Sequence, residues 1–173
     1  MVAPRIVLVG PDSSGRHHLA LLLTRGVIPG YIPLIIQRES FAITYRGVQH
    51  VFVLDLVMET TELNVCQSYY SEARAALLCI SIDDSDAETN MKTWIQLLKR
   101  FLPFVPIVIV GTKNDLRENP DVSVLDVDTF ADLAQRLGAS RYTECSAIRQ
   151  SGISELKNLI CQQAFDNNTS VEA

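Results

Sequence analysis

Two short polar segments, each following an apolar run, contain side chains that can recognise a purine base. They are Thr112-Lys-Asn-Asp115 and Ser146-Ala147. The carboxylate of Asp115 can accept hydrogen bonds from the N1 and N2 donors of guanine while the Lys113 stem covers the ring. The backbone N–H groups of the second segment can donate to the guanine O6. Adenine lacks this donor pair, and an unpaired Asp115 in a dry pocket costs on the order of 1–3 kcal/mol. Together the segments predict a guanine-selective pocket.

The same segments resemble the nucleotide-binding motifs of the small GTPases, and in particular those of the Rho branch. Three stretches support the likeness: Thr112-Lys-Asn-Asp-Leu-Arg117, Ile28-Pro-Gly-Tyr-Ile-Pro33, which resembles the Rho first switch, and Tyr142-Thr-Glu-Cys-Ser-Ala147, which resembles the last base-binding loop. The likeness extends from Arg5 to about Phe165. It implies an α/β fold of P-loop NTPase type, a small G domain whose six-stranded, mostly parallel sheet has helices on both faces. It ordinarily implies a GTP/GDP switch as well.

The hydrophobic pattern predicts a compatible architecture, because short β-rich runs alternate with longer helical patterns. Strands are expected at 6–9, 41–45, 48–55, 75–82 and 107–112, with a hairpin turn at 46–47, and helices at 16–24, from an acidic cluster at 83–86 to about 101, at 127–137 and at 154–165. Helical stripes such as Met91, Trp94, Ile95 and Leu98 are typical of core. Length and composition predict one domain over 4–166 and a short polar tail at 167–173.

A candidate phosphate loop lies between the first strand and the first helix. Gly10-Pro-Asp-Ser-Ser-Gly-Arg-His17 stands where Gly-x-x-x-x-Gly-Lys-Ser/Thr is expected. Both glycines are present, so backbone N–H groups and a helix N-terminus can still hold phosphates. The candidate phosphate-binding residues are Gly10, Asp12, Ser13, Ser14, Gly15, Arg16 and His17. The alternative is a serine-rich turn that begins a helix and binds no ligand.

Three residues of this loop depart from the phosphate-binding pattern. Arg16 replaces the lysine, and a forked guanidinium does not occupy the place of a compact ammonium between phosphates. His17 replaces the hydroxyl expected to coordinate magnesium, a metal that prefers hard oxygen ligands. Asp12 places a carboxylate where it repels a terminal phosphate. We therefore expect magnesium binding here to be weak, although GTP or GDP binding remains possible.

The two switch segments implied by the resemblance show further departures. In the first, Tyr31 and Pro33 match, but Leu34 replaces a threonine that holds magnesium and senses the terminal phosphate. In the second, Asp55 is kept and is a weak metal candidate. Met58 removes a glycine whose N–H approaches the terminal phosphate, and Glu59 stands where a glutamine positions the attacking water. No catalytic residue is therefore assigned, although Glu59 stands at the glutamine position.

Phosphoryl transfer depends on positioning and charge neutralisation, and losing one such stabiliser commonly costs roughly 10²–10³ in rate. The expected function is therefore an atypical Rho-like protein, a pseudo-GTPase that acts as a signalling or scaffolding module with little or no GTP hydrolysis. The alternative is a divergent switch that binds GTP or GDP and hydrolyses slowly or with a partner's help, with Arg16 supplying charge in place of magnesium. A flavodoxin-like or dinucleotide-binding domain shares the alternating pattern but lacks a Gly-x-Gly-x-x-Gly loop.

Composition narrows the partners and the location. The net charge is −5 and no basic block occurs, which argues against nucleic acid. The four cysteines show no Cys-x-x-Cys spacing and are typical of reduced, mostly buried thiols in a cytoplasmic protein. The C-terminal residues lack a prenylation box, so stable membrane anchoring is not expected. We expect protein partners, bound through the switch-like surfaces around Tyr31, Pro33, Leu34 and Met58.

Overall fold

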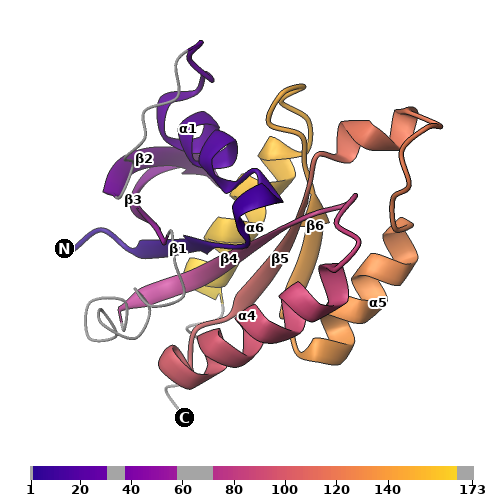
Figure 1. The fold of residues 1–173 in the computed structure, drawn as a ribbon. Coiled ribbons are helices and arrows are strands. Elements are labelled where there is room, and N and C mark those ends of the chain that lie inside the picture. The colour runs from indigo at the N-terminus through magenta and orange to yellow at the C-terminus, as the bar shows by residue number, and fades with distance from the viewer. Residues whose placement is uncertain (1, 31–37, 58–71, 167–173) are drawn as a thin grey trace.

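The computed structural model describes residues 2–30, 38–57 and 72–166. Within these residues six strands form one sheet, in the order β2-β3-β1-β4-β5-β6 (Figure 1). Their bounds are β1 Arg5–Val9, β2 Arg38–Tyr45, β3 Val48–Leu56, β4 Ala73–Ser81, β5 Ile107–Thr112 and β6 Arg141–Glu144. All neighbouring strands pair in parallel except β2 and β3. The predicted six-stranded, mostly parallel α/β sheet is therefore confirmed.

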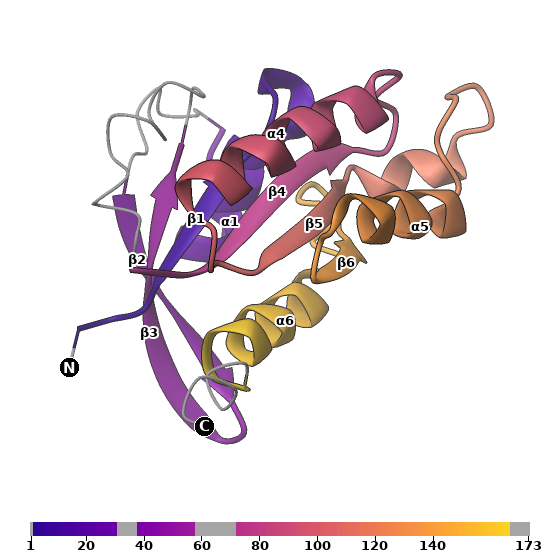
Figure 2. The same ribbon diagram turned by 90° about the horizontal axis from the view of Figure 1, so that it is seen from below.

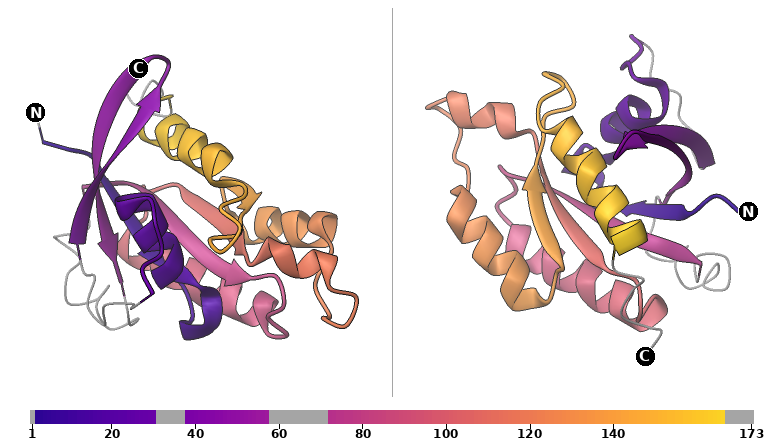
Figure 3. Two further views of the ribbon diagram at one scale, coloured as in Figure 1. Left: turned by 90° about the horizontal axis from the view of Figure 1, so that it is seen from above. Right: turned by 180° about the vertical axis from the view of Figure 1, so that it is seen from behind.

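Helices cover both faces of this sheet. They are α1 (Arg16–Arg25), α4 (Ala87–Phe101), α5 (Val127–Leu137) and α6 (Ile153–Phe165), with short 3₁₀ turns η1 (Asp12–Ser14) and η2 (Asn114–Glu118). Helices α4 and α5 lie in front of the sheet in Figure 1, and α6 lies in front when the molecule is seen from behind (Figure 3, right). The predicted helix bounds differ from these by one residue at the end of α1 and at the start of α6.

The core has two halves because β1 presents alternate residues to opposite faces. Ile6 and Leu8 pack with residues of α1 and α6, whereas Val7 and Val9 pack with residues of α4 and α5. All four side chains are fully buried. Strands buried on both faces read as continuous apolar runs, which explains the lack of alternation in β1 and β4.

The predicted helical stripes lie in the core with one exception. Met91, Trp94, Ile95 and Leu98 of α4 are buried, as are Phe130, Leu133 and Ala134 of α5. Val127, which shares the α5 stripe by spacing, is exposed. It is the first residue of the helix, and the buried face begins one turn later at Phe130. Helical spacing fixes a direction around the helix axis but not where the underlying sheet ends.

The hairpin between β2 and β3 forms at the predicted turn. Arg46 and Gly47 both have positive φ, at 51° and 79°, as a two-residue turn of this hand requires. Asp166, at the end of α6, accepts hydrogen bonds from the Tyr45 hydroxyl at 3.0 Å and from Arg46 at 3.1 Å. Figure 2 shows the hairpin tip beside this end of α6. The turn fixes the strand register and so decides which β2 and β3 residues face each other across the hairpin.

The acidic cluster before α4 closes the turn that begins the helix. Asp84 accepts hydrogen bonds from the Asp86 N–H at 2.8 Å and from the Asn90 side chain at 2.7 Å. Among the described residues no cluster of histidine, cysteine, aspartate and glutamate could hold a metal ion. The hydrogen bonds of Asp84 therefore connect the turn to the first residues of α4.

The described thiols match the expectation for buried cysteines. Cys79, Cys145 and Cys161 are free and buried, and Cys66 lies outside the described residues. Burial, with Glu144 nearby, raises the pKa of the Cys145 thiol to about 12. In the part of the chain that the structure covers, no helix has the length and apolar character needed to cross a bilayer.

Candidate nucleotide-binding site

The predicted site residues follow neighbouring strands of the sheet. The phosphate loop follows β1, Lys113 follows β5 and Ser146 lies just after β6. Because the carboxyl ends of parallel strands meet at one edge, these loops converge there, and this edge is where ligands bind in open α/β sheets. The sheet therefore brings together segments that are far apart in the sequence.

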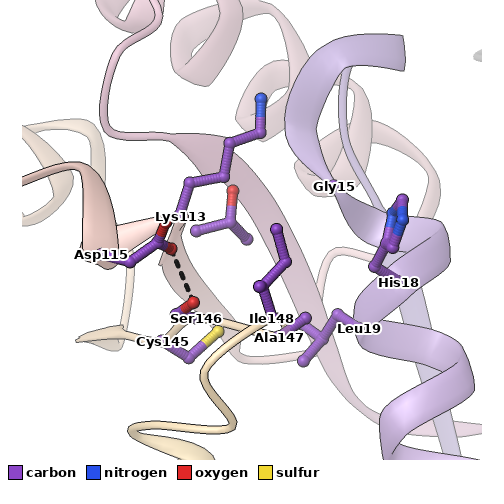
Figure 4. A pocket seen from close by; sticks show the side chains of 10 residues that line it. Gly15, His18, Leu19, Lys113, Asp115, Cys145, Ser146, Ala147 and Ile148 are labelled. Atoms are coloured by element: carbon purple, nitrogen blue, oxygen red, sulfur yellow. Dashed lines mark hydrogen bonds between the residues drawn. The ribbon is translucent and has the colours of Figure 1, made fainter. Parts of the chain in front are cut away.

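All five residues predicted to recognise the base line a single hollow at this edge (Figure 4). They are Thr112, Lys113, Asp115, Ser146 and Ala147. The cavity volume of the hollow is about 110 Å³, less than the roughly 300–1,000 Å³ of whole small-molecule sites. Four further side chains line it that were not predicted as site residues: His18, Leu19, Cys145 and the exposed Ile148. The hollow therefore offers mostly apolar walls to a part of a ligand, such as a flat ring.

Asp115 is oriented by a hydrogen bond from the other base-binding segment. The Ser146 hydroxyl donates to Asp115 Oδ1 at 2.6 Å (Figure 4). No described residue donates to Asp115 Oδ2, so this oxygen remains an acceptor for a ligand. The predicted role of the Ser146 backbone was wrong, because its N–H donates to the Ser151 carbonyl at 3.0 Å. None of the described residues accepts from the Ala147 N–H, and its donation to the base stays a prediction.

Lys113 stands at the rim of the hollow in an uncommon backbone conformation. Its φ of 61° and ψ of 37° are left-handed, a region that non-glycine residues seldom adopt outside functional or turn sites. Its ammonium lies 4.0 Å from the Asp83 carboxylate. The residue before it, Thr112, donates from its hydroxyl to the Ser14 carbonyl at 2.5 Å. The base hollow and the phosphate loop are therefore joined directly.

The phosphate loop is folded tightly against β4. A side chain on Gly10 would place its Cβ 2.4 Å from the Cys79 carbonyl oxygen, so only glycine fits here. The Ser14 N–H donates to the Pro11 carbonyl at 3.0 Å and is thereby used within the loop. Ser13, like Asp12, is exposed in the same turn. At least one backbone donor that the sequence assigned to phosphate binding is therefore already occupied.

Arg16 points into its own loop. The side chain is only 2% exposed and donates to the Gly10 carbonyl and, at 2.9 Å, to the Asp12 carboxylate. The guanidinium charge is therefore balanced by groups of the loop. Burial, with Arg16 and His18 nearby, lowers the pKa of the His17 imidazole and so favours its neutral form.

Asp55, the predicted metal candidate, forms an ion pair with a residue that the sequence analysis did not select. Asp55 Oδ1 accepts a hydrogen bond from Arg38 Nε at 2.5 Å, and its carboxylate is 4% exposed. Arg38 and Asp55 are directly opposite each other across the hairpin. Magnesium requires about six hard oxygen ligands in octahedral geometry. The described residues do not fit it, because Asp55 is paired with a cation and His17 offers nitrogen.

The remaining predicted residues lie outside the described part of the chain. They are Tyr31, Pro33 and Leu34 of the first switch-like segment and Met58 and Glu59 of the second.

Comparison with known proteins settles the family. The sequence model described as "Ras family" matches residues 5–166. The chain belongs to the Ras family. Among its relatives are "GTP-binding protein RHO1" of Candida albicans, 27% identical over 164 residues that cover 88% of this chain and 83% of the relative. "Ras-like GTP-binding protein RHO1" of Entamoeba histolytica is 28% identical over 170 residues, 95% of this chain and 78% of the relative. "Rho-related protein racI" of Dictyostelium discoideum is 27% identical over 167 residues, which cover 88% of this chain and 82% of the relative. The Rho-like resemblance is thus confirmed.

A polar network ties together the two base-binding segments of this Ras-family protein. Arg117 of η2 donates to both carboxylate oxygens of Glu144, at 2.9 and 2.5 Å, and to the Leu125 carbonyl at 2.7 Å. The Tyr142 hydroxyl donates to the same carboxylate. Hydrogen bonding to Glu144 raises the pKa of Arg117, and burial together with Glu144 raises the pKa of Tyr142. The segment with Asp115 is thereby fixed to the segment with Ser146.

Substitution of Glu144 by glutamine is expected to lower the free energy of unfolding by about 1–3 kcal/mol, because a partly buried Arg117 loses its charged acceptor. The free energy is measured by urea denaturation. Glu118→Gln is the matched control, since Glu118 pairs with Arg149 at 2.5 Å on the exposed surface, where an ion pair contributes little. Equal losses in the two variants would contradict a structural role for the Arg117–Glu144 pair.

Proposed function

We propose that this Ras-family protein is a Rho-like pseudo-GTPase that recognises guanine nucleotides but hydrolyses GTP little or not at all. Its role is that of a cytoplasmic signalling or scaffolding module that binds other proteins through its switch-like surfaces. Nucleic acid and stable membrane attachment are not part of the proposal.

The observation that supports guanine recognition is the hydrogen bond between Ser146 and Asp115. It leaves one carboxylate oxygen of Asp115 available in a mostly apolar hollow. A carboxylate held in this way favours the paired N–H donors of guanine over the edge of adenine, because adenine would leave it unsatisfied.

The arrangement of the phosphate loop supports the lack of turnover. Charge developing on a transferred phosphoryl group must be met by preorganised donors. Here the Arg16 guanidinium is 2% exposed and bonded to the loop, and His17 tends to remain neutral. Two expected stabilisers are therefore absent from the described site, and Glu59, at the water-positioning place in the sequence, adds negative charge.

A divergent switch with slow or partner-assisted hydrolysis is the second candidate. The complete set of base-recognition residues in the hollow favours it. In such a switch Arg16 must supply positive charge to the nucleotide. The guanidinium can do so only if it leaves the Gly10 carbonyl and the Asp12 carboxylate. A partner that rearranges the phosphate loop would be needed for that movement.

Two measurements on the purified protein test the proposal. The first is chromatography of the nucleotide released on denaturation, and the second is multiple-turnover hydrolysis of GTP. We expect GTP or GDP near stoichiometry and no turnover above that of the buffer. Turnover that disappears in the Asp115→Ala variant would identify the divergent switch instead. An empty pocket, with no shift in melting temperature on adding GTP, would contradict guanine recognition altogether.

A further inference from the structure

We propose that Arg38 takes the place of a divalent cation at Asp55, so that this site excludes magnesium and a bound guanine nucleotide is retained without it. The inference deepens the proposed function and rests on it for the nucleotide, but the exclusion of the metal can be tested on the empty protein.

The register of the β2–β3 hairpin places Arg38 opposite Asp55. The two-residue turn at Arg46 and Gly47 sets a register that runs without interruption from Tyr45↔Val48 to Arg38↔Asp55. Residues directly opposite each other in an antiparallel pair have their Cβ atoms about 5 Å apart, within reach of a side-chain ion pair. The contact between Arg38 and Asp55 is therefore a product of the backbone rather than of one adjustable surface side chain.

The chemistry of the pair opposes a metal ion. Arg38 Nε lies 2.5 Å from Asp55 Oδ1, a short charge-assisted hydrogen bond to a carboxylate that is 4% exposed. Asp55 Oδ2 is buried and has no hydrogen-bond donor among the described residues, so it is the one oxygen left for a cation. A divalent ion bound there would lie beside the guanidinium and be repelled by it. Binding magnesium thus requires displacement of Arg38.

The phosphate loop also lacks the ligands that magnesium needs. Magnesium in nucleotide sites is held by a few protein oxygens and the phosphates. At the hydroxyl position of the loop this chain has His17, and the cation next to it, Arg16, is balanced by Asp12 at 2.9 Å. In both pairs, Arg16 with Asp12 and Arg38 with Asp55, a guanidinium is matched by one carboxylate without an ion. Among the described residues, each of these two carboxylates therefore already has a positive partner in the absence of metal.

The test compares wild type with Arg38→Ala and with the charge-preserving Arg38→Lys. The release rate of a fluorescent GDP analogue is measured in magnesium and after addition of EDTA. In parallel, manganese binding to nucleotide-free protein is followed by electron paramagnetic resonance. Wild type is expected to release GDP at rates that agree within about twofold in the two buffers and to bind no manganese at millimolar concentration. Arg38→Ala is expected to release it about tenfold faster, equivalent to about 1.4 kcal/mol, and Arg38→Lys to stay closer to wild type.

The outcomes separate this inference from the proposed function. Acceleration of wild-type release by about tenfold with EDTA, or stoichiometric manganese binding by wild type, would overturn it. An Arg38→Ala variant that releases GDP at the wild-type rate would also overturn it. If neither wild type nor any variant binds GDP, the proposed function fails, and the manganese measurement alone tests the exclusion of metal. Manganese binding by Arg38→Ala but not by wild type supports the exclusion. Any other pattern of manganese binding refutes it.

Discussion

Replacement of Asp115 by alanine is expected to raise the dissociation constant for GDP by about 10²–10³-fold. Two hydrogen bonds to a charged acceptor are lost, and each contributes about 1.5–3 kcal/mol before partial compensation by water. Affinity is measured by titration calorimetry. Ser146 fixes Asp115 through the 2.6 Å hydrogen bond, so Ser146→Ala is expected to weaken binding about tenfold by loosening the carboxylate. A loss as large as that of Asp115→Ala would mean that Ser146 contacts the base itself.

A change of selectivity separates base recognition from simple damage. Asp115→Asn offers an N–H donor where the native residue only accepts, and xanthine has a carbonyl where guanine has its amino group. This variant is therefore expected to bind xanthosine diphosphate more tightly than GDP. A variant that loses GDP without gaining xanthosine diphosphate, while its melting temperature is unchanged, would contradict the placement of Asp115 against the base edge.

Replacement of Phe130 by alanine is expected to reduce the free energy of unfolding by about 3–5 kcal/mol, the range typical of fully buried aromatic residues. Phe130 is completely buried in α5, and its ring stacks on Tyr142 with centroids 5.1 Å apart. The cavity left behind adds to the lost burial, because neighbouring side chains relax only in part. The free energy is obtained from urea denaturation of the nucleotide-free protein.

Phe104→Ala provides the matched control for this prediction. Phe104 is the same residue type but is 97% exposed, so its removal is expected to change the free energy of unfolding by less than about 0.5 kcal/mol. A large loss at Phe104 would show that it is covered in solution. A small loss at Phe130 would mean that the α5 layer does not pack on the sheet as described.

The sheet, its helices and the base hollow were predictable from the sequence because each depends on local pattern. Continuous apolar runs identify strands buried on both faces, and the order of parallel strands brings Asp115 and Ser146 to one edge. The role of the Ser146 N–H was not predictable, since it depends on the turn that brings Ser151 back to it. His18 and Ile148 were missed because residue type does not specify which way a loop or helix faces.

Arg38 was missed for a different reason, although a signal was present. It is separated from Asp55 by seventeen positions in the chain, and nothing in either residue's neighbourhood indicates the other. The hairpin turn at 46–47 was nevertheless expected, and counting outward from a two-residue turn places Arg38 opposite Asp55. Strand register, not motif matching, was the information needed.

The cross-strand pair of Arg38 and Asp55 also restricts the mutational routes open to this chain. Loss of Arg38 alone leaves a buried carboxylate uncompensated, and loss of Asp55 alone leaves the arginine without its acceptor, so either step costs about 1–3 kcal/mol. Recovery of a hydroxyl at position 17 brings no benefit while Arg38 remains. Single substitutions toward an ordinary magnesium site therefore lower the stability or bring no gain unless the others are already present. The cross-strand pair of the hairpin therefore opposes every single substitution that would lead back to a magnesium-binding site.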